Sequence, residues 1–543
     1  MSMVAGDVQN GLSIIQLTDQ FLENDFEGRK ETRSAPPAEL EDALTATGFG
    51  FYNILTVLAA IPVAWAGAFD MTTMTFILAS AECDLELTFI RKGALVSSVY
   101  LGMTMSSFFW SFVTDRLSRK ALMLMGLLID ALCNILCCTV ESYHVMLLLK
   151  FITGTIVSGP FTLLIPYVNE FQPANYRQSF TTWSGLIFNV GFIAPAILAF
   201  NITPQAWSFV LFNREYTAWR IYLMTCTLPS IIGVVTISLF SDSPKGLMET
   251  EHVPKVLCLL RRMYVINNFK SPETYPIKSL QSITSCDQEI RKTNIDRMKG
   301  TWSDIMQLCN KKYLKPFLII NFLQLGSLLG FNVMRLWVPH MFMVINNFDS
   351  TMWDWSLGNP TMCDYLSRAV IFESPTNDTL YVNDCAQWRI NPIIYVRSTI
   401  IAFSTVSFGF LFAQLYTTRH RKRMAMTFCY MIAVVSSFLA NWVQLVPIML
   451  ILSSAIVVSS RITGNIVIAI NATTIPLPLR ATAVGFITNT GNLATILGNL
   501  IFSFLLGVHC YSAFVGIGCI LLFCLVLSFY ALRPPREKVV IRT

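Results

Sequence analysis

Asp115-Arg116-Leu117-Ser118-Arg119-Lys120 is a charged stretch that separates two apolar runs, residues 93–113 and 121–140. Each run is about 20 residues long, the length of α-helix that crosses the ~30 Å hydrocarbon core of a bilayer. A helix satisfies its own backbone hydrogen-bonding groups in lipid, so both runs are predicted to be transmembrane helices. The charged stretch between them is then a short turn at the membrane surface.

Apolar runs of the same length recur along the whole chain. Hydrophobic residues make up 54% of the 543 residues and charged residues only 13%, a composition unsuited to a water-facing surface. We therefore predict an all-α membrane protein with twelve helices in two halves of six. The predicted spans are 49–79, 93–113, 121–140, 145–168, 179–200 and 220–240 in the first half, and 316–345, 393–415, 424–442, 446–474, 482–507 and 510–531 in the second.

Basic residues predict which loops face the cytosol, because Lys and Arg are enriched in cytosolic loops. They gather in the turns after the second, eighth and tenth predicted helices and in a polar linker. Both termini are therefore expected in the cytosol, and the net charge of +6 needs no nucleic-acid partner. The expected organisation is a largely disordered tail at 1–48, six-helix halves at 49–240 and 316–531, a linker with short helices at 241–315, and a second tail at 532–543.

The loop 346–392 is acidic and rich in turn residues, and we expect it on the opposite, exoplasmic side. It contains the sequon Asn377-Asp378-Thr379, which predicts glycosylation of Asn377. Cys363 and Cys385 flank the sequon and are predicted to form a disulfide, since that side is oxidising. Two alternatives remain open: one of the two pairs with Cys83, or both stay free.

Two heptapeptides indicate an internal repeat. Gly185-Leu-Ile-Phe-Asn189-Val-Gly191 lies in the fifth predicted helix, and Gly485-Phe-Ile-Thr-Asn489-Thr-Gly491 lies in the eleventh. Their spacing is identical, and each follows an arginine. This match favours two six-helix halves that descend from one unit.

The turn at 115–120 resembles the Gly-x3-Asp-Arg-x-Gly-Arg-Arg/Lys signature of the major facilitator superfamily, with Ser111 and Ser118 in place of the glycines. Further matches follow in order at Glu170 through Arg177, at 241–245 and at 476–480. The resemblance implies the major facilitator fold, in which the first, fourth, seventh and tenth helices line a central cavity.

Ser80-Ala81-Glu82-Cys83-Asp84 and the segment 98–103 resemble, more narrowly, the synaptic vesicle glycoprotein 2 family. Trp183 aligns with a tryptophan of that family and is a candidate for stacking on a ring-bearing solute. The tenth helix departs from the family pattern, because Gly464 and Ile468 stand where the family has tryptophan and aspartate. The resemblance therefore implies no ligand specificity.

Ionisable residues within the predicted helices are candidate functional residues, because a lone charge in lipid costs several kcal/mol. Asp70 resembles the acidic coupling position of proton-linked sugar porters, and Lys150 takes the place of that family's arginine. The pair is a candidate for proton coupling, or for a static ion pair that orients two helices. Asp130 in the third predicted helix is left unassigned.

Arg335 and Arg461 lie on the seventh and tenth predicted helices, which the resemblance directs toward the cavity. Two cations there would suit an anionic solute, with Asn465 as a further contact. Alternatively, Arg335 reaches the membrane interface and Arg461 neutralises a carboxylate such as Asp70.

A set of charged residues at the cytosolic helix ends forms the candidate gate. The resemblance implies a network that holds the halves together when the outside is open, whereas the simpler alternative is that the basic members serve topology only. The set consists of Asp115, Arg116, Arg119, Lys120, Glu170 and Arg177.

No nucleotide-binding Gly-x4-Gly-Lys-Ser/Thr loop is present, and the five histidines lack metal-site spacing. Neither an enzyme nor a cofactor is expected. We predict a multi-pass transporter of a small organic solute by alternating access, with protons as candidate co-substrates, in the plasma membrane or an intracellular vesicle. The alternative is a non-transporting glycoprotein that acts by binding proteins in trafficking.

Overall fold

A computed structural model places most of the chain. It describes residues 38–78, 80–113, 117–177, 187–205, 207–211, 214–249, 253–281, 303, 305–347, 359–366, 391–415 and 418–531. Ten segments of this described chain are long and apolar enough to cross a membrane, which confirms a multi-span helical protein.

The long helices follow the predicted order. The first half has α3 (Phe51–Asp70), α5 (Phe89–Val113), α6 (Arg119–Cys137), α7 (Tyr143–Asn169), η1 (Val190–Phe192) with α9 (Ala194–Ile202), and α10 (Ala218–Thr225) with α11 (Leu228–Ser238). The second half has α15 (Lys311–Asn346), α18 (Ile393–Leu415), α19 (Arg419–Leu439), α20 (Val446–Thr474), α21 (Leu477–Val508) and α22 (Cys510–Ala531).

The first predicted helix, 49–79, is broken in the structure. It ends at Asp70, and a short helix, α4 (Thr73–Ile77), follows. The Thr72 and Thr73 hydroxyls each donate to a carbonyl four residues earlier, Ala68 O at 2.5 Å and Phe69 O at 2.8 Å. Side-chain bonds of this kind bend helices, which explains a break that apolar content alone did not predict.

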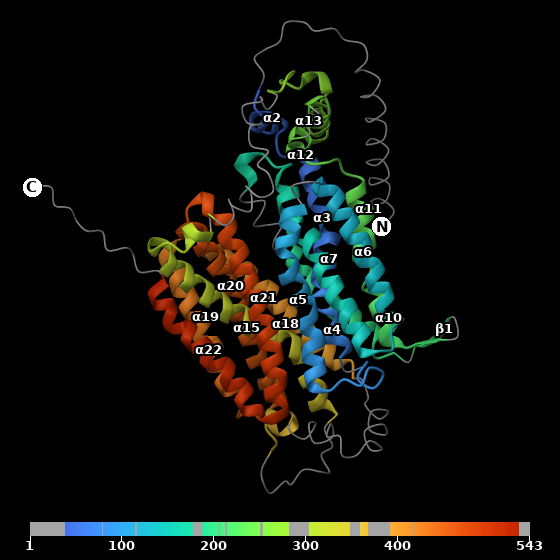
Figure 1. Ribbon diagram of the computed structural model, residues 1–543, viewed down its shortest axis with the longest axis vertical. Helices are drawn as coiled ribbons and strands as arrows, with labels where there is room; N and C mark the ends of the chain where they lie inside the picture. Colours follow the sequence, from blue (N-terminus) through green and yellow to red (C-terminus); the bar gives the residue numbers. More distant parts are fainter. Residues whose placement is uncertain are drawn as a thin grey trace, which may run out of the picture.

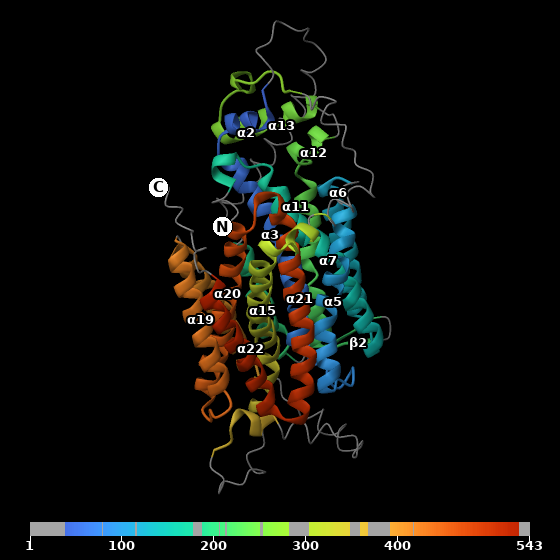
Figure 2. The same cartoon turned by 60° about the vertical axis from the view of Figure 1, so that its left-hand side comes forward.

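The two halves lie side by side (Figures 1 and 2). We call the end of the bundle with the helices of the linker the linker end, and the opposite end the hairpin end. A two-stranded antiparallel hairpin at the latter, β1 (Phe209–Leu211) and β2 (Arg214–Tyr216), was not predicted.

At the hairpin end the halves are in direct contact, mainly through α5 against α21. A Cβ added to Gly93 of α5 would lie 2.3 Å from Ser503 Oγ of α21, so only glycine permits this approach. Nearby, Ser97 Oγ donates to Ile496 O at 3.4 Å. Phe89 stacks on Trp337 of the second half, with ring centroids 6.4 Å apart. These contacts close the hairpin end.

The linker end has a small helical layer of its own. The helix α2 (Leu40–Thr47) packs on α13 (Val253–Asn268), next to α12 (Pro244–Glu249). Asn267 of α13 donates to Gly48 O at 3.0 Å and accepts from the Tyr52 amide at 2.9 Å. The tail predicted to be largely disordered therefore contains one packed helix, because its apolar Ala43 and Leu44 are buried there.

The predicted Cys363–Cys385 disulfide is wrong, because Cys363 pairs with Cys510 at the start of α22. A cysteine makes a single disulfide, so Cys385, which lies outside the described residues, cannot also take Cys363. Cys83 is disulfide-bonded as well. Asn377 also lies outside the described residues, and its glycosylation stays a prediction.

The last glycines of the two repeated heptapeptides occupy equivalent places in their halves. A Cβ on Gly191 would meet Trp65 of α3 at 2.6 Å, and a Cβ on Gly491 would meet Leu328 of α15 at 2.0 Å. Each glycine thus packs against the first long helix of its own half. This agrees with the predicted internal repeat.

Gly154 provides a direct test of the packing between α5 and α7. A Cβ there would lie 2.1 Å from Val99 O, a backbone atom that cannot move aside. We expect Gly154→Ala to lower the stability by about 1–3 kcal/mol or more, measured as the thermal midpoint of the protein in detergent. Gly516 has nothing within 4 Å of an added Cβ, so Gly516→Ala is the matched control. Equal midpoints for the two variants would contradict the packing.

Candidate functional site

A cavity lies between the two halves and is lined by both of them. The first half contributes the α3–α4 junction, α4, η1 and the residue before it, and the second half contributes α15, α18 and α20. The lining residues are Thr72, Phe76, Asn189, Phe192, Phe331, Arg335, Val338, Pro339, Ser398, Ile401, Ala402, Thr405, Val406, Gly409, Val457, Arg461 and Asn465. The predicted residues Arg335, Arg461 and Asn465 therefore share one cavity.

Arg335 of α15 reaches across to the first half. Its Nη1 donates to Thr72 Oγ1 at 3.1 Å and its Nη2 to Tyr100 OH at 2.9 Å. A longer bond of 3.3 Å joins Nη2 to Asn332 in its own helix. The guanidinium also lies 4.9 Å from the centre of the Phe192 ring, a favourable cation–π distance. Arg335 therefore does not extend to the interface as the alternative interpretation required.

Arg461 of α20 also contacts the first half. Its Nη2 donates to Asn189 Oδ1 at 2.8 Å. Asn189 is the fifth residue of the first repeated heptapeptide, and the repeat pattern did not predict its contact with Arg461. Its counterpart Asn489 also contacts the opposite half, donating to Ser107 Oγ at 3.0 Å. The repeat thus supplies one polar contact between the halves from each side.

The cavity is positively charged. Both guanidiniums lie against the Phe331 ring, Arg335 at 5.1 Å and Arg461 at 4.9 Å from its centre. No aspartate or glutamate is among the residues described as lining it. Among the described residues, the hydrogen bonds of both arginines go to neutral oxygens, so Arg461 does not neutralise Asp70. The cavity can therefore accept negative charge.

A second group of buried ionisable residues lies within the first half. Lys150 Nζ donates to Asn134 Oδ1 at 2.7 Å, and Asn134 Nδ2 donates to Asp70 Oδ1 at 2.9 Å and Asp130 Oδ1 at 3.2 Å. Ser230 Oγ donates to the other oxygen of Asp130 at 2.7 Å. We call these five residues, all at most 7% exposed, the buried carboxylate cluster.

The cluster modifies the predicted Asp70–Lys150 pair. The two side chains are brought together, but Asn134 lies between them. Within the described chain, Asp70 and Lys150 form no direct ion pair with each other. Asp130 has no assigned role in the sequence prediction, and Asn134 was missed because a lone asparagine in an apolar run has no distinctive signal. The i, i+4 spacing of Asp130 and Asn134 places both on one helix face, and this spacing could have indicated their contact.

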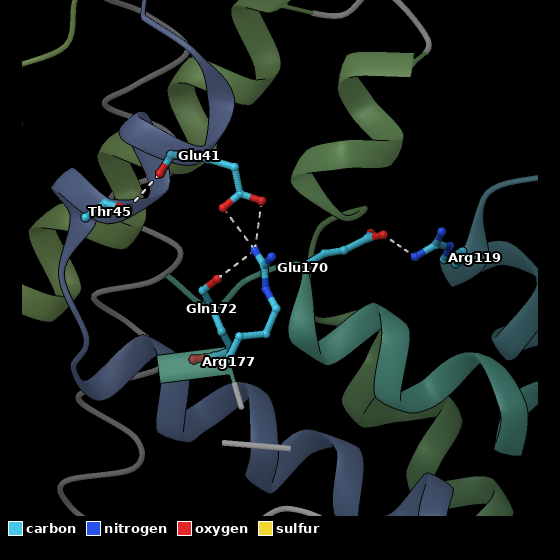
Figure 3. Close-up of polar contacts among 6 residues, drawn as sticks. All are labelled: Glu41, Thr45, Arg119, Glu170, Gln172 and Arg177. Atoms are coloured by element: carbon cyan, nitrogen blue, oxygen red, sulfur yellow. Dashed lines mark hydrogen bonds and ion pairs between the residues drawn. The ribbon is translucent and has the colours of Figure 1, made fainter. Parts of the chain in front are cut away.

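The charged residues at the linker end form two separate pairs (Figure 3). Arg119 at the start of α6 pairs with Glu170 at the end of α7. Arg177 donates to both oxygens of Glu41 of α2 at 3.1 Å and to Gln172 O at 3.2 Å.

Lys120 donates to the carbonyls of Ser238 and Phe240, at the end of α11. Each of these contacts joins elements of the first half and its tail, so none of them crosses to the second half in this structure. Asp115, Arg116 and Trp183 lie outside the described residues, and their roles stay predictions.

Two packed helical halves with a cavity between them, lined from both, define a multi-pass membrane protein with the architecture of a transporter. The model of the family described as "Sugar (and other) transporter" matches residues 25–354, more than half of the chain. The chain belongs to this family, which is a family of transporters and not of enzymes.

Solved structures show the same fold. The partially occluded inward-open form of the xylose transporter XylE from E. coli matches with a TM-score of 0.62 over 89% of this chain and 100% of that one, at 13% identity. The nucleoside transporter NupG matches with a TM-score of 0.54 over 88% and 99%, at 13% identity. These matches confirm the predicted major facilitator fold.

Sequence relatives confirm the narrower resemblance. The chain is 24% identical to synaptic vesicle glycoprotein 2A of Rattus norvegicus over 276 residues, 50% of this chain and 37% of the relative. It is 25% identical to synaptic vesicle glycoprotein 2B of the same species over 276 residues, 50% and 40% of the two chains. The match thus spans about two fifths of the length of these relatives.

Asn134 should stabilise the cluster that it joins. Asn134→Ala leaves Lys150 and the two carboxyls without their common partner, so we expect a loss of about 3 kcal/mol or more. The thermal midpoint of the purified variant measures this loss. Asn310, the residue before α15, makes no side-chain cap bond, and Asn310→Ala is the control. A midpoint as high for Asn134→Ala as for Asn310→Ala would rule out the bridging role.

Proposed function

We propose that this protein is a secondary transporter that carries a small organic solute by alternating access, with the solute bound in the central cavity. The observation that carries the proposal is a cavity lined from both halves by polar and charged groups. Rocking of one half against the other would expose such a site to each side in turn.

The solute is proposed to be an anion. Arg335 and Arg461 give the cavity two positive charges, and the described lining supplies no carboxylate to offset them. An anion would compensate both charges at once, whereas an organic cation would add to the repulsion. Asn465, Ser398 and Thr405 would offer neutral polar contacts to the same solute.

Transport is proposed to be coupled to protons through the buried carboxylate cluster. With both aspartates ionised and Lys150 protonated the cluster has a net charge of −1, and one bound proton makes it neutral. Such a site is well suited to hold and release a proton as its surroundings change. Asp70 also lies two residues before Thr72, which lines the cavity and accepts from Arg335. The α3–α4 break could therefore transmit the protonation state to the cavity.

The linker end is proposed to face the cytosol, because basic residues gather there. The present contacts, closed at the hairpin end, would then correspond to an inward-facing state. In the opposite state we propose that Asp115, Arg116, Arg119, Lys120, Glu170 and Arg177 rearrange to hold the linker ends of the halves together. The plasma membrane and a vesicle membrane are both compatible with this topology.

A second candidate function is a non-transporting glycoprotein that acts by binding other proteins. The matches to the synaptic vesicle glycoproteins favour it, together with the departures in the facilitator signature. The two candidates differ in one observable. A transporter changes the accessibility of cysteines at both ends when it binds solute, whereas a fixed scaffold does not.

Asp70→Asn tests proton coupling. Benzenesulfonate stays ionised at both pH values of the assay. Its uptake into proteoliposomes can therefore be followed at external pH 5.5 and 7.5, which lie about one unit on either side of an ordinary histidine pKa. We expect faster uptake at the acidic pH for the natural protein and a rate ratio near one for Asp70→Asn, because the variant cannot exchange a proton at this position.

Glu86→Gln is the matched control for charge removal, since Glu86 is an exposed carboxylate at the hairpin end, paired only loosely with Arg91 at 3.6 Å. It should keep the natural ratio. An unchanged pH dependence of uptake in Asp70→Asn would contradict the coupling proposal. Absence of uptake of organic anions, organic cations, sugars and nucleotides alike would favour the non-transporting glycoprotein.

A further inference from the structure

We propose that the solute is an organic anion with an apolar body, and that its binding releases Arg335 from a latch that holds the two halves closed. The inference rests on the proposed transport function and deepens it. It names the chemistry of the solute and gives the two arginines of the cavity different roles.

The latch consists of the hydrogen bonds that Arg335 makes to the first half. Arg335 extends from α15 of the second half, yet its two shorter bonds go to Thr72 and Tyr100 of the first half, at 3.1 Å and 2.9 Å. Hydrogen bonds from a charged donor are stronger than neutral ones. The halves cannot separate at the hairpin end without breaking both bonds. Closure there is therefore tied to the position of one guanidinium.

Arg461 is the principal anion-binding residue. Among the described residues, its one hydrogen bond joins Nη2 to Asn189 at 2.8 Å. Nε, Nη1 and the second N–H of Nη2 make no hydrogen bond there, and Arg461 lines the cavity, so an Nη1–Nη2 or Nε–Nη2 fork can bind a ligand. The planar guanidinium fork matches a carboxylate or sulfonate, which can accept two parallel bonds.

The two arginines line the same cavity, and we infer that one anion lies between them. Both guanidiniums lie about 5 Å from the centre of the Phe331 ring, at 5.1 Å and 4.9 Å. An anion held by Arg461 would offer Arg335 charged oxygens in exchange for the hydroxyls of Thr72 and Tyr100. Breaking the latch would then cost less, so the bound anion would shift the population toward a state open at the hairpin end.

The body of the solute is inferred from the rest of the wall. Phe192, Phe331, Val338 and Ile401 are apolar and line the same cavity as the two arginines. A ring or short hydrocarbon part would be dehydrated against these side chains while its acidic group met the arginines. Benzenesulfonate has both parts, and benzenesulfonamide is its neutral counterpart.

Ser97 offers a reporter for opening at the hairpin end. It is 3% exposed and lies in the contact between α5 and α21. A Ser97→Cys reporter, with the exposed Cys309 and Cys519 changed to serine, should react slowly with a charged methanethiosulfonate while the halves are closed. The rate for the protein without the reporter is subtracted as background.

The latch is tested by Thr72→Val combined with Tyr100→Phe, which removes both acceptors and leaves both arginines in place. We expect the reporter to react at least about tenfold faster, which the loss of even one of the two charge-assisted hydrogen bonds implies. Arg335→Gln, a second variant, should have the same effect. Arg397→Gln is the matched control, because Arg397 lies against Phe342 of its own half. An unchanged rate in both latch variants would overturn the inference.

The anion is tested on the same reporter. Benzenesulfonate should raise the reaction rate, benzenesulfonamide should not, and Arg461→Gln should abolish the response. By reciprocity, the Thr72→Val/Tyr100→Phe variant should bind benzenesulfonate more tightly. A response to the neutral compound, a response that survives Arg461→Gln, or no response at all would overturn the anion site.

The reporter needs no flux, so the two levels of inference can fail separately. A protein that opens with benzenesulfonate but carries nothing would contradict the transport function. A protein that carries solutes while the reporter ignores the latch variants would contradict the latch alone.

Discussion

Two arginines that share a cavity with no carboxylate in its described lining are the constraint on which the site depends. A charged side chain inside a membrane protein must be paired with an opposite charge, hydrated, or required for binding or transport. Lys150 meets this condition within its own half, through Asn134 and two aspartates. Arg335 and Arg461 meet it only in part, with neutral acceptors and the faces of aromatic rings. In the proposed function, this incomplete pairing of the two charges would drive the binding of an anion.

The residues that accept the shorter hydrogen bonds from the two arginines belong to the other half of the protein. The bonding of each arginine is therefore tied to the contact between the halves. Each arginine is carried by the second half, whereas Thr72, Tyr100 and Asn189 belong to the first. A change in the bonding of either guanidinium therefore changes the free energy of contact between the halves. Small residues make these contacts possible, since Gly93 lets α5 approach Ser503 of α21. In the proposed transport cycle, polar bonds and close packing together would set the balance between closed and open states.

Much of the fold could be predicted from the sequence, because the length of an apolar run is fixed by the thickness of the bilayer. The boundaries of α20 and α22 were predicted to the residue. The α3–α4 break was not, since it depends on the side-chain bonds of Thr72 and Thr73. The pairing of Cys363 was also missed, because its partner Cys510 is 147 residues away and no local pattern connects them.

The charged residues of the candidate site were predicted from the sequence, but their hydrogen-bond partners were not. Arg335 and Arg461 stood out because cations are rare in apolar runs, and both line the cavity. Their partners are neutral residues of kinds that are common in membrane helices. Tyr100 carried no signal of its own, and Asn189 stood out only as part of the repeated heptapeptide. Asn134 was missed for the same reason, although it joins every ionisable group of the buried cluster.

The most direct test of the central claim, that the cavity binds a small organic anion, is the thermal stability of the purified protein with a panel of solutes. The panel contains organic anions, organic cations, sugars and nucleotides, because any ligand of the folded state raises its stability by mass action. At a concentration 100 times its Kd, an anion should add about 2.7 kcal/mol, and Arg461→Gln should remove the effect. Stabilisation by sugars or cations but not by simple organic anions, or by anions equally in Arg461→Gln, would contradict the claim.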